Sequence, residues 1–308
     1  MTNGFGKRLV VRLLLTILLT FTVLGTLGSG YAGYLLSSPK VCLSQVEKQQ
    51  AAAKIHDSVE SYFTAQYQTT AIPAETYLNV VTEDWIAERL EEQITSEYQI
   101  LNGAKLSYQL DMSDLEAALT QFFSDYAEEI NYTKDSTYEQ KLQETIDNAE
   151  AELTSQLDVY HFSTMRNANI LSQLTGKQLY LWIACGVCGV VSLLLMGILM
   201  GLERNGEWGM LYFPGCALFI NGVFLILPTA WVLATSYFSG LAIKVPAVYA
   251  VVTGVLYHCT RVGLVAGIVL AVLGLAAIVG STIGRRKAAR YENSRFHSTF
   301  SRWHQARP

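Results

Sequence analysis

The chain has 308 residues, of which 51% are hydrophobic and 16% are charged, and its formal net charge is −4. This hydrophobic fraction is high for a water-soluble protein, and the apolar residues are gathered into blocks instead of being spread along the chain. The composition excludes an ordinary soluble domain and predicts an integral membrane protein.

Four apolar blocks are long enough to cross a bilayer. Each has the roughly 20 apolar residues that about 30 Å of hydrocarbon requires. Backbone polar groups in lipid must be paired internally, so each block is expected to be a helix. We predict one transmembrane helix within residues 1–36 and three more at residues 179–202, 209–235 and 262–284.

A long polar interval, residues 37–178, separates the first block from the second. It holds 9 Lys and Arg against 23 Asp and Glu, a net charge of −14, whereas the tail at residues 285–308 has a net charge of +6. Cytoplasmic segments of membrane proteins carry an excess of Lys and Arg. We therefore predict a multi-pass protein of the cell membrane, with both termini in the cytoplasm and residues 37–178 outside.

The first block has two interpretations. Its basic start, its apolar stretch and the small residues Gly28-Ser29-Gly30 suit a cleaved signal peptide. However, the apolar character continues from Tyr31 to Leu36, beyond this point. We therefore predict an uncleaved anchor.

The polar interval has the pattern of an all-α domain. Apolar residues recur at helical spacing, and no alternating strand pattern of useful length is present. A capping-box pattern, Ser113 with Glu116, marks one helix start. Helices are predicted near residues 40–67, 82–103, 113–130 and 136–160. The predicted fold class is all-α: four transmembrane helices with a helical bundle of about 120 residues inserted between the first and second.

Two further segments belong to the predicted membrane topology. Residues 203–208 contain the turn dipeptide Asn205-Gly206 and predict a tight cytoplasmic hairpin. Residues 245–261 are apolar but, at about 16 residues, short for a span. We predict that they form an interfacial or re-entrant helix.

The basic tail also contains aromatic residues at helical spacing. This pattern predicts a short helix on the inner leaflet, with arginines towards anionic headgroups. A disordered tail that only sets the topology is the alternative. The candidate inner-leaflet contacts are Arg285, Arg286, Lys287, Arg290, Phe296, Phe300 and Trp303.

Polar residues near or within the spans supply the other candidate sites. Asn221 lies in mid-span, where an amide needs a partner, so it indicates an interhelical contact or a conduction path. We favour the contact, because no second buried ionisable group accompanies it. His258 and Arg261 share a helical face at the predicted outer mouth of the fourth span. They are candidates for binding an anion or a lipid headgroup, or for simple interfacial anchoring.

The remaining motifs favour packing or solvation over chemistry. Cys185-Gly-Val-Cys188 has redox spacing but lies in an apolar span. Cys42, the one cysteine outside the spans, is expected to be a free thiol, with a disulfide-linked dimer as the alternative. Asn131-Tyr132-Thr133 fits a glycosylation acceptor, a pattern that is frequent by chance. Close helix contacts are permitted by the pairs Gly197 and Gly201, Gly263 and Gly267, and Gly280 and Gly284.

Metal, cofactor and nucleic-acid sites are not predicted. The acidic pairs lie on polar helix faces without a calcium-loop pattern, and neither His56 nor His161 has metal-ligand spacing. No phosphate-binding loop or nucleophile elbow is present in the sequence. We therefore expect no cofactor and no enzymatic activity.

Short stretches of the polar interval resemble a known group of proteins. They are Ile72-Pro73, Asp84-Trp85-Ile86, Tyr98, Leu101-Asn102-Gly103, and Asp111 to Leu115. In these stretches and in layout, the chain resembles uncharacterised four-span membrane proteins of Gram-positive, clostridial-type bacteria that have a helical outer domain. The resemblance implies the architecture and brings no activity with it.

The layout of one span, an outer domain and three spans is also similar to bacterial ABC-type permeases of the cell-division and macrolide-export kind. Those permeases couple to an ATPase through a longer cytoplasmic segment between the second and third spans. The short turn at residues 203–208 departs from that pattern and puts the coupling in doubt.

Two functional hypotheses from different classes follow. The first is a non-enzymatic membrane protein whose acidic outer domain binds or senses an envelope partner, either a protein or a cationic peptide. The second is a subunit of a transport or mechanotransmission complex. Membrane lipid is an expected partner of either, the glycine spacings leave a homo-oligomer open, and a nucleic-acid partner is not expected.

Overall fold

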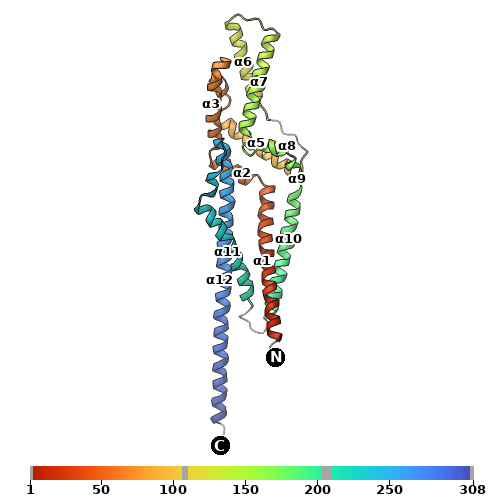
Figure 1. Cartoon of the computed structure of the whole chain (residues 1–308), viewed down its shortest axis with the longest axis vertical. Helices are drawn as coiled ribbons and strands as arrows, with labels where there is room; N and C mark the ends of the chain where they lie inside the picture. The colour runs from red at the N-terminus through yellow and green to blue at the C-terminus, as the bar shows by residue number, and fades with distance from the viewer. Residues whose placement is uncertain (1–2, 106–109, 203–209, 306–308) are drawn as a thin grey trace. The chain divides into compact units, whose positions relative to one another are not determined.

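The computed structural model describes residues 3–105, 110–202 and 210–305, and within these the side chains from residue 9 to residue 286. Helices make up 85% of the chain, and the described residues contain no strand (Figure 1). The predicted all-α fold class is therefore confirmed. The predicted hairpin at residues 203–208 lies outside the described residues.

Four helical segments are long and apolar enough to cross a membrane. They lie in α1 (Asn3–Ser37), in the segment Ile170–Leu202 that includes α10 (Lys177–Leu202), in α11 (Tyr212–Ala234) and in α12 (Pro246–Gln305). In each segment, a stretch of 18 residues has a mean hydropathy between 2.1 and 2.8 and contains at most two charged residues. The protein is therefore a multi-pass membrane protein whose spans imply contact with lipid.

The chain divides into two units. The membrane unit comprises residues 1–33, 179–237 and 258–308, and the insert domain comprises residues 34–178 and 238–257. The insert domain therefore combines the whole polar interval with a segment from much later in the chain. Its helices are α2 (Lys40–Lys48), α3 (Ala51–Thr70), α4 (Ala74–Leu78), α5 (Glu83–Leu101), α6 (Ser113–Glu129), α7 (Ser136–Leu157), α8 (Phe162–Asn167) and α9 (Ile170–Leu174).

Side-chain caps fix where two of these helices, α5 and α7, begin. Thr82 accepts a hydrogen bond from the backbone N–H of Trp85 at 3.2 Å and starts α5. Asp135 accepts from two backbone N–H groups at 3.0 Å and starts α7. At α6 the predicted capping box is wrong: Met112 is the N-cap without a side-chain bond, and Asp111 instead accepts from the N–H of Ser113 at 3.0 Å.

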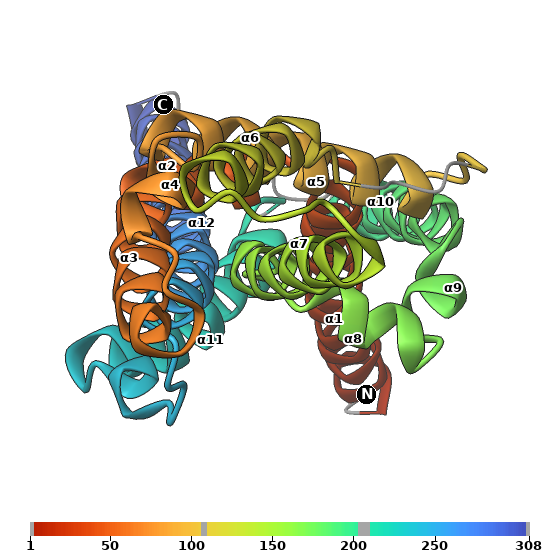
Figure 2. The ribbon, with the colours of Figure 1, turned by 90° about the horizontal axis from the view of Figure 1, so that it is seen from above.

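The insert domain has its own hydrophobic core. Fully buried residues at helical spacing, such as Ile55 and Val59 of α3 and Ile86 and Leu90 of α5, meet at its centre. In Figure 2, which shows the chain from above, α6 and α7 lie side by side, as their contacts require. This core accounts for the apolar stripes that the sequence pattern placed on α3, α5, α6 and α7.

The first turns of α12 complete this core. Ala247, Val248 and Val251 are buried within it, and a Cβ atom added to Gly254 would lie 2.9 Å from Oε1 of Gln45 in α2. Residues 245–261 therefore differ from the separate interfacial or re-entrant helix that we predicted. From Pro246 onward they are the start of one uninterrupted helix, and Ala247, Val248 and Val251 are buried against protein.

Many large apolar side chains on the spans of the membrane unit are exposed. Examples are Leu14 and Phe21 of α1, Leu193 of α10, Phe224 of α11 and Val265 of α12, each more than half exposed. An apolar surface around a helix is typical of a membrane span, because lipid covers it.

Two pairs of these helices are in close contact through small residues. A Cβ atom added to Gly222 of α11 would lie 2.4 Å from the backbone N of Ala271, and one added to Gly274 of α12 would lie 2.4 Å from the N of Phe219. Between α1 and α10, Gly25 and Gly30 face Cys188 and Cys185. The two cysteines of the redox-spaced pair therefore pack against glycines, and neither is in a disulfide.

Candidate functional site

An open groove lies along α2, the start of α3 and the start of α5 in the insert domain. Its volume is about 620 Å³. The floor contains alanine and aliphatic side chains, among them Ala51 and Val46, and the charged residues on its walls are exposed. The charged lining residues are Lys40, Glu47, Glu83, Asp84 and Glu91. We call this feature the acidic groove.

The charge of the acidic groove has a local cause. Glu83 and Asp84 occupy the first turn of α5, where the positive end of the helix dipole favours carboxylates. Glu91 follows two turns later, and Glu47 faces the groove from α2. Four carboxylates against the single ammonium of Lys40 give a local excess of three negative charges. Such a surface repels anions and attracts cations.

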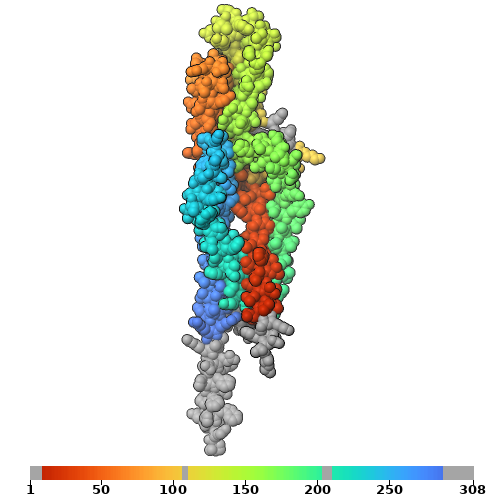
Figure 3. Space-filling model, in the orientation of Figure 1, coloured from red at the N-terminus to blue at the C-terminus, as the bar shows by residue number. Residues whose placement is uncertain are grey.

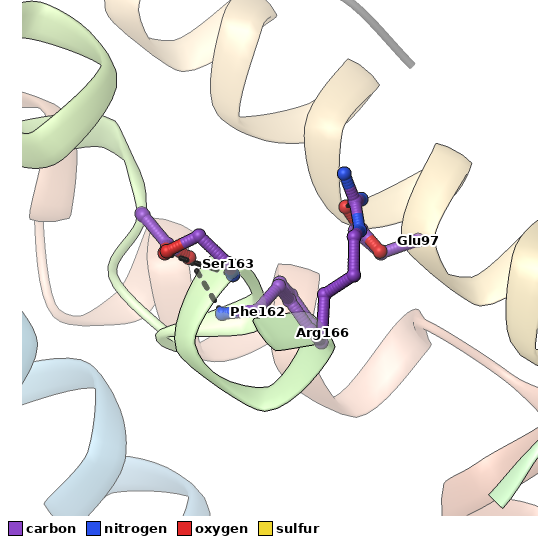
Figure 4. A network of polar contacts seen from close by, with 5 residues as sticks. Glu97, Phe162, Ser163 and Arg166 are labelled. Atoms are coloured by element: carbon purple, nitrogen blue, oxygen red, sulfur yellow. Dashed lines mark hydrogen bonds and ion pairs between the residues drawn. The ribbon is translucent and has the colours of Figure 1, made fainter. Parts of the chain in front are cut away.

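A buried polar network joins α5 to α8 (Figure 4). Arg166 of α8 donates a hydrogen bond to Oε1 of Glu97, whose side chain is only 3% exposed. The second oxygen of Glu97, Oε2, is buried and has no hydrogen-bond partner among the described residues. A carboxylate that keeps one oxygen unpaired in a low-dielectric site is destabilised in its charged form.

The pKa of Glu97 reflects this environment. Burial raises it, the guanidinium of Arg166 lowers it, Asp158 raises it again, and the net direction is upward from 4.5. Asp158 itself accepts hydrogen bonds from the N–H of Phe162 at 2.7 Å and the N–H of Ser163 at 3.1 Å, which fixes the start of α8. The network therefore attaches α8 to the rest of the insert domain, and it contains one ionisable group, Glu97, whose charged form is destabilised.

Cys42 lies among tyrosines in the same domain. Its Sγ is 3.2 Å from the hydroxyl of Tyr98, and its backbone carbonyl accepts a hydrogen bond from Tyr160 at 2.9 Å. Burial strongly raises the pKa of the Tyr160 hydroxyl, which is therefore a neutral donor. Cys42 is half-buried and not in a disulfide.

Asn221 lies at the closest contact between α11 and α12. Its side chain is fully buried, next to Gly222, and neither Oδ1 nor Nδ2 has a hydrogen-bond partner in the described part of the chain. Pro228 lies inside α11 and is exposed. The interhelical amide contact that we expected at Asn221 stays a prediction.

The other candidates from the sequence lie on α12. His258 is half-buried and Arg261 is exposed, and both are inside the uninterrupted helix. Arg285 and Arg286 are exposed, and the Arg285 guanidinium lies 5.6 Å from the ring centroid of Tyr212. Lys287, Arg290, Phe296, Phe300 and Trp303 belong to the helical backbone of α12, but their side chains lie outside the described residues.

The sequence analysis did not predict two groups of residues that lie together in the structure. Glu97 and Arg166 are 69 residues apart, and only the folded chain brings them together. The possible ligand atoms of His56, Asp57 and Glu60 in α3 lie within 4.8 Å of one another, although His56 had been treated as isolated. Their spacing of one and four residues on a helix was the available signal. Asp57 and Glu60 are exposed, and nothing further indicates an ion.

No family model matches the chain, and no curated protein or solved structure is similar enough to match it. The fold alone therefore defines the class: a four-span membrane protein with an all-α insert domain. The resemblance to four-span proteins of Gram-positive bacteria stays a prediction.

Proposed function

We propose that this protein is a non-enzymatic binding module of the cell membrane, whose insert domain lies outside the cell and takes a cationic envelope partner in the acidic groove. Both termini are then cytoplasmic, as the basic tail favours. The observation that carries the proposal is the lining of the groove, in which carboxylates outnumber cations four to one. A lysine-rich or arginine-rich peptide segment complements this charge.

Charge in the remainder of the chain supports this choice of partner. The interval at residues 37–178 contains 23 of the 26 acidic residues of the protein. A cationic partner is thus attracted to the whole domain before it reaches the groove. Such long-range steering raises association rates and weakens as salt screens it.

Binding of a fluorescent oligolysine peptide to the full-length protein in uncharged lipid nanodiscs tests the proposal. Glu47→Gln with Glu91→Gln removes two groove carboxylates without touching the first turn of α5. We expect about threefold to tenfold weaker binding, because each exposed ion pair contributes roughly 0.2–1 kcal/mol. The matched control is Glu128→Gln with Glu129→Gln, which removes the same charge from the exposed end of α6.

The two double variants separate a groove from a general charge effect. If both weaken binding equally, only net charge matters and the groove is not the site. If the unaltered protein does not bind the peptide at low salt, the cationic partner is excluded.

A second candidate function is a subunit of a transport or mechanotransmission complex. It is supported by α12, a single uninterrupted helix that contributes to the core of the insert domain and then forms the last span. A partner bound to the domain would act directly on a transmembrane helix. Affinity purification in mild detergent, with mass spectrometry of the associated proteins, tests this candidate: a stoichiometric ATPase supports it, and its absence contradicts it.

A further inference from the structure

A small hollow between α3, α4 and α7 has a lining unlike that of the acidic groove. Its volume is about 270 Å³, and none of its lining residues carries a charge. Figure 3 shows the surfaces of α3 (orange) and α7 (green) beside each other in this domain. Hydroxyl and amide groups come from six lining residues: Tyr62, Gln66, Thr70, Tyr77, Thr145 and Asn148.

Tyr77 is the most deeply placed of these polar residues. Its side chain is 3% exposed, and its ring stacks on Phe63 with 3.8 Å between centroids. No hydrogen bond of its hydroxyl occurs among the described residues. Burial and the neighbouring Tyr62 raise the pKa of Tyr77 to about 12, so the hydroxyl is neutral at physiological pH. Tyr77 lines the hollow, so its hydroxyl is available to hydrogen-bond a ligand there.

Three further polar groups at the hollow are also available. The hydroxyls of Thr70 and Thr145 already donate to carbonyls of their own helices. By contrast, Tyr62, Gln66 and Asn148 have no side-chain hydrogen bond in the described structure. With Tyr77, they offer two phenol hydroxyls and two amides, drawn from three helices around one space. Each of these groups can both donate and accept a hydrogen bond.

We propose that this hollow binds one ring of a neutral sugar. The hydroxyls of a sugar both donate and accept, and they match the uncharged phenols and amides of the lining. An ionic ligand would find no counter-charge there, and a purely apolar ligand would cover the phenols and amides of the lining without hydrogen-bonding to them. The volume is near the lower end for small-molecule sites, which suits a single ring. The hollow shares no residue with the acidic groove, so the sugar site and the cationic-partner site can be tested independently.

Saturation-transfer NMR with N-acetylglucosamine and the full-length protein in nanodiscs tests the proposal. Tyr77→Phe keeps the ring and removes only the hydroxyl, and Asn148→Leu replaces an exposed amide. We expect the affinity to fall by about threefold to tenfold in each variant, the effect of one hydrogen bond. The matched controls, Tyr67→Phe and Gln68→Leu, alter exposed residues of α3 outside the hollow and should leave the affinity unchanged.

Absence of saturation transfer to the unaltered protein overturns the proposal. Equal affinity in Tyr77→Phe, Asn148→Leu and the controls also overturns it, because the sugar would then bind elsewhere. A second experiment replaces the monosaccharide with its β-1,4-linked trisaccharide. Tighter binding of the trisaccharide identifies a glycan chain as the source of the ring, and equal binding identifies a free sugar; both results support the site.

Discussion

At the scale of single residues, Glu97 is an ionisable group held away from water. It is buried, one oxygen pairs with Arg166 and the other has no partner among the described residues. The sequence offered little to predict this, because Glu97 stands one position before the apolar stripe residue Tyr98 and resembles the exposed acids around it. Its burial depends on α8, whose position only the folded chain determines.

Replacing Glu97 with Gln should reduce the pH dependence of stability. A raised pKa means that the folded state binds the proton more tightly, so stability is greatest below 4.5 and falls as pH rises through the folded pKa. We expect the melting temperature of full-length Glu97→Gln, measured by circular dichroism, to decrease less with rising pH than that of the unaltered protein. The control Glu88→Gln, an exposed acid of the same helix, should retain the slope. An unchanged slope in Glu97→Gln would show that other groups cause it.

Arg166→Gln should have the opposite effect on the same pair. Without the guanidinium, the buried carboxylate loses its one partner, which costs about 1–3 kcal/mol in the free energy of unfolding at neutral pH. The loss should shrink in acid, where Glu97 is protonated. Chemical denaturation at neutral and acidic pH measures both values, and an equal loss at both would refute the ion pair as the cause.

At the scale of elements, α12 is where sequence and structure differ most. Residues 245–261 are too short for a span, and their neighbours in the insert domain include Gln45 of α2, far earlier in the chain. Periodicity alone therefore cannot distinguish burial in protein from burial in lipid. Helices α3, α5, α6 and α7 were predictable, because apolar stripes at Ile55, Ile86, Leu115 and Leu153 match the core that the structure shows. The one helix predicted near residues 40–67 is instead two, α2 and α3, and the short helices α4, α8 and α9 were not predicted.

Truncating Val251 tests whether α12 belongs to the insert domain. Val251 is fully buried in its core, so Val251→Ala should cost about 1–3 kcal/mol, the usual range for a small cavity. Val245→Ala, at an exposed position just before the helix, is the control. Denaturation of the full-length protein provides the comparison, and equal stability of the two variants would place residues 245–251 outside the core.

The contact between α11 and α12 predicts a position-specific effect of small substitutions. A Cβ atom at Gly222 would lie 2.4 Å from a backbone atom of α12, so Gly222→Ala must separate the helices, at a cost of about 1–3 kcal/mol. Gly197→Ala in α10 has nothing within 4 Å and should be neutral. Of the glycines singled out by spacing, Gly263 and Gly267 have neighbours in the structure, whereas Gly197, Gly201 and Gly280 have none within 4 Å. The close contact between α11 and α12 uses glycines seven apart, Gly215 and Gly222 on one helix and Gly267 and Gly274 on the other. The thermal stabilities of Gly222→Ala and Gly197→Ala in detergent measure this difference, and equal stability would contradict the close contact between α11 and α12.

At the scale of the whole molecule, the protein combines four spans with an insert domain that we propose lies outside the cell. Block lengths and charge predicted the spans, because crossing hydrocarbon demands long apolar helices whatever the fold. The acidic groove and the sugar hollow were beyond the sequence, since each draws on residues from helices that meet only in the folded domain. Both proposed sites require the insert domain to face the envelope.

The orientation can be measured directly, because the chain has one N-glycosylation acceptor, Asn131-Tyr132-Thr133, in the insert domain. Asn131 and Thr133 are exposed, so an oligosaccharyltransferase can reach them if the domain is lumenal. The measurement is translation of the full-length protein with endoplasmic reticulum microsomes, alongside Asn131→Gln and the double variant Asn131→Gln with Arg295→Thr, which moves the acceptor to the tail. The account predicts one glycosylated band for the natural chain and none for either variant. Glycosylation of the tail acceptor, with Asn131 unmodified in the natural chain, would contradict the orientation on which both sites depend.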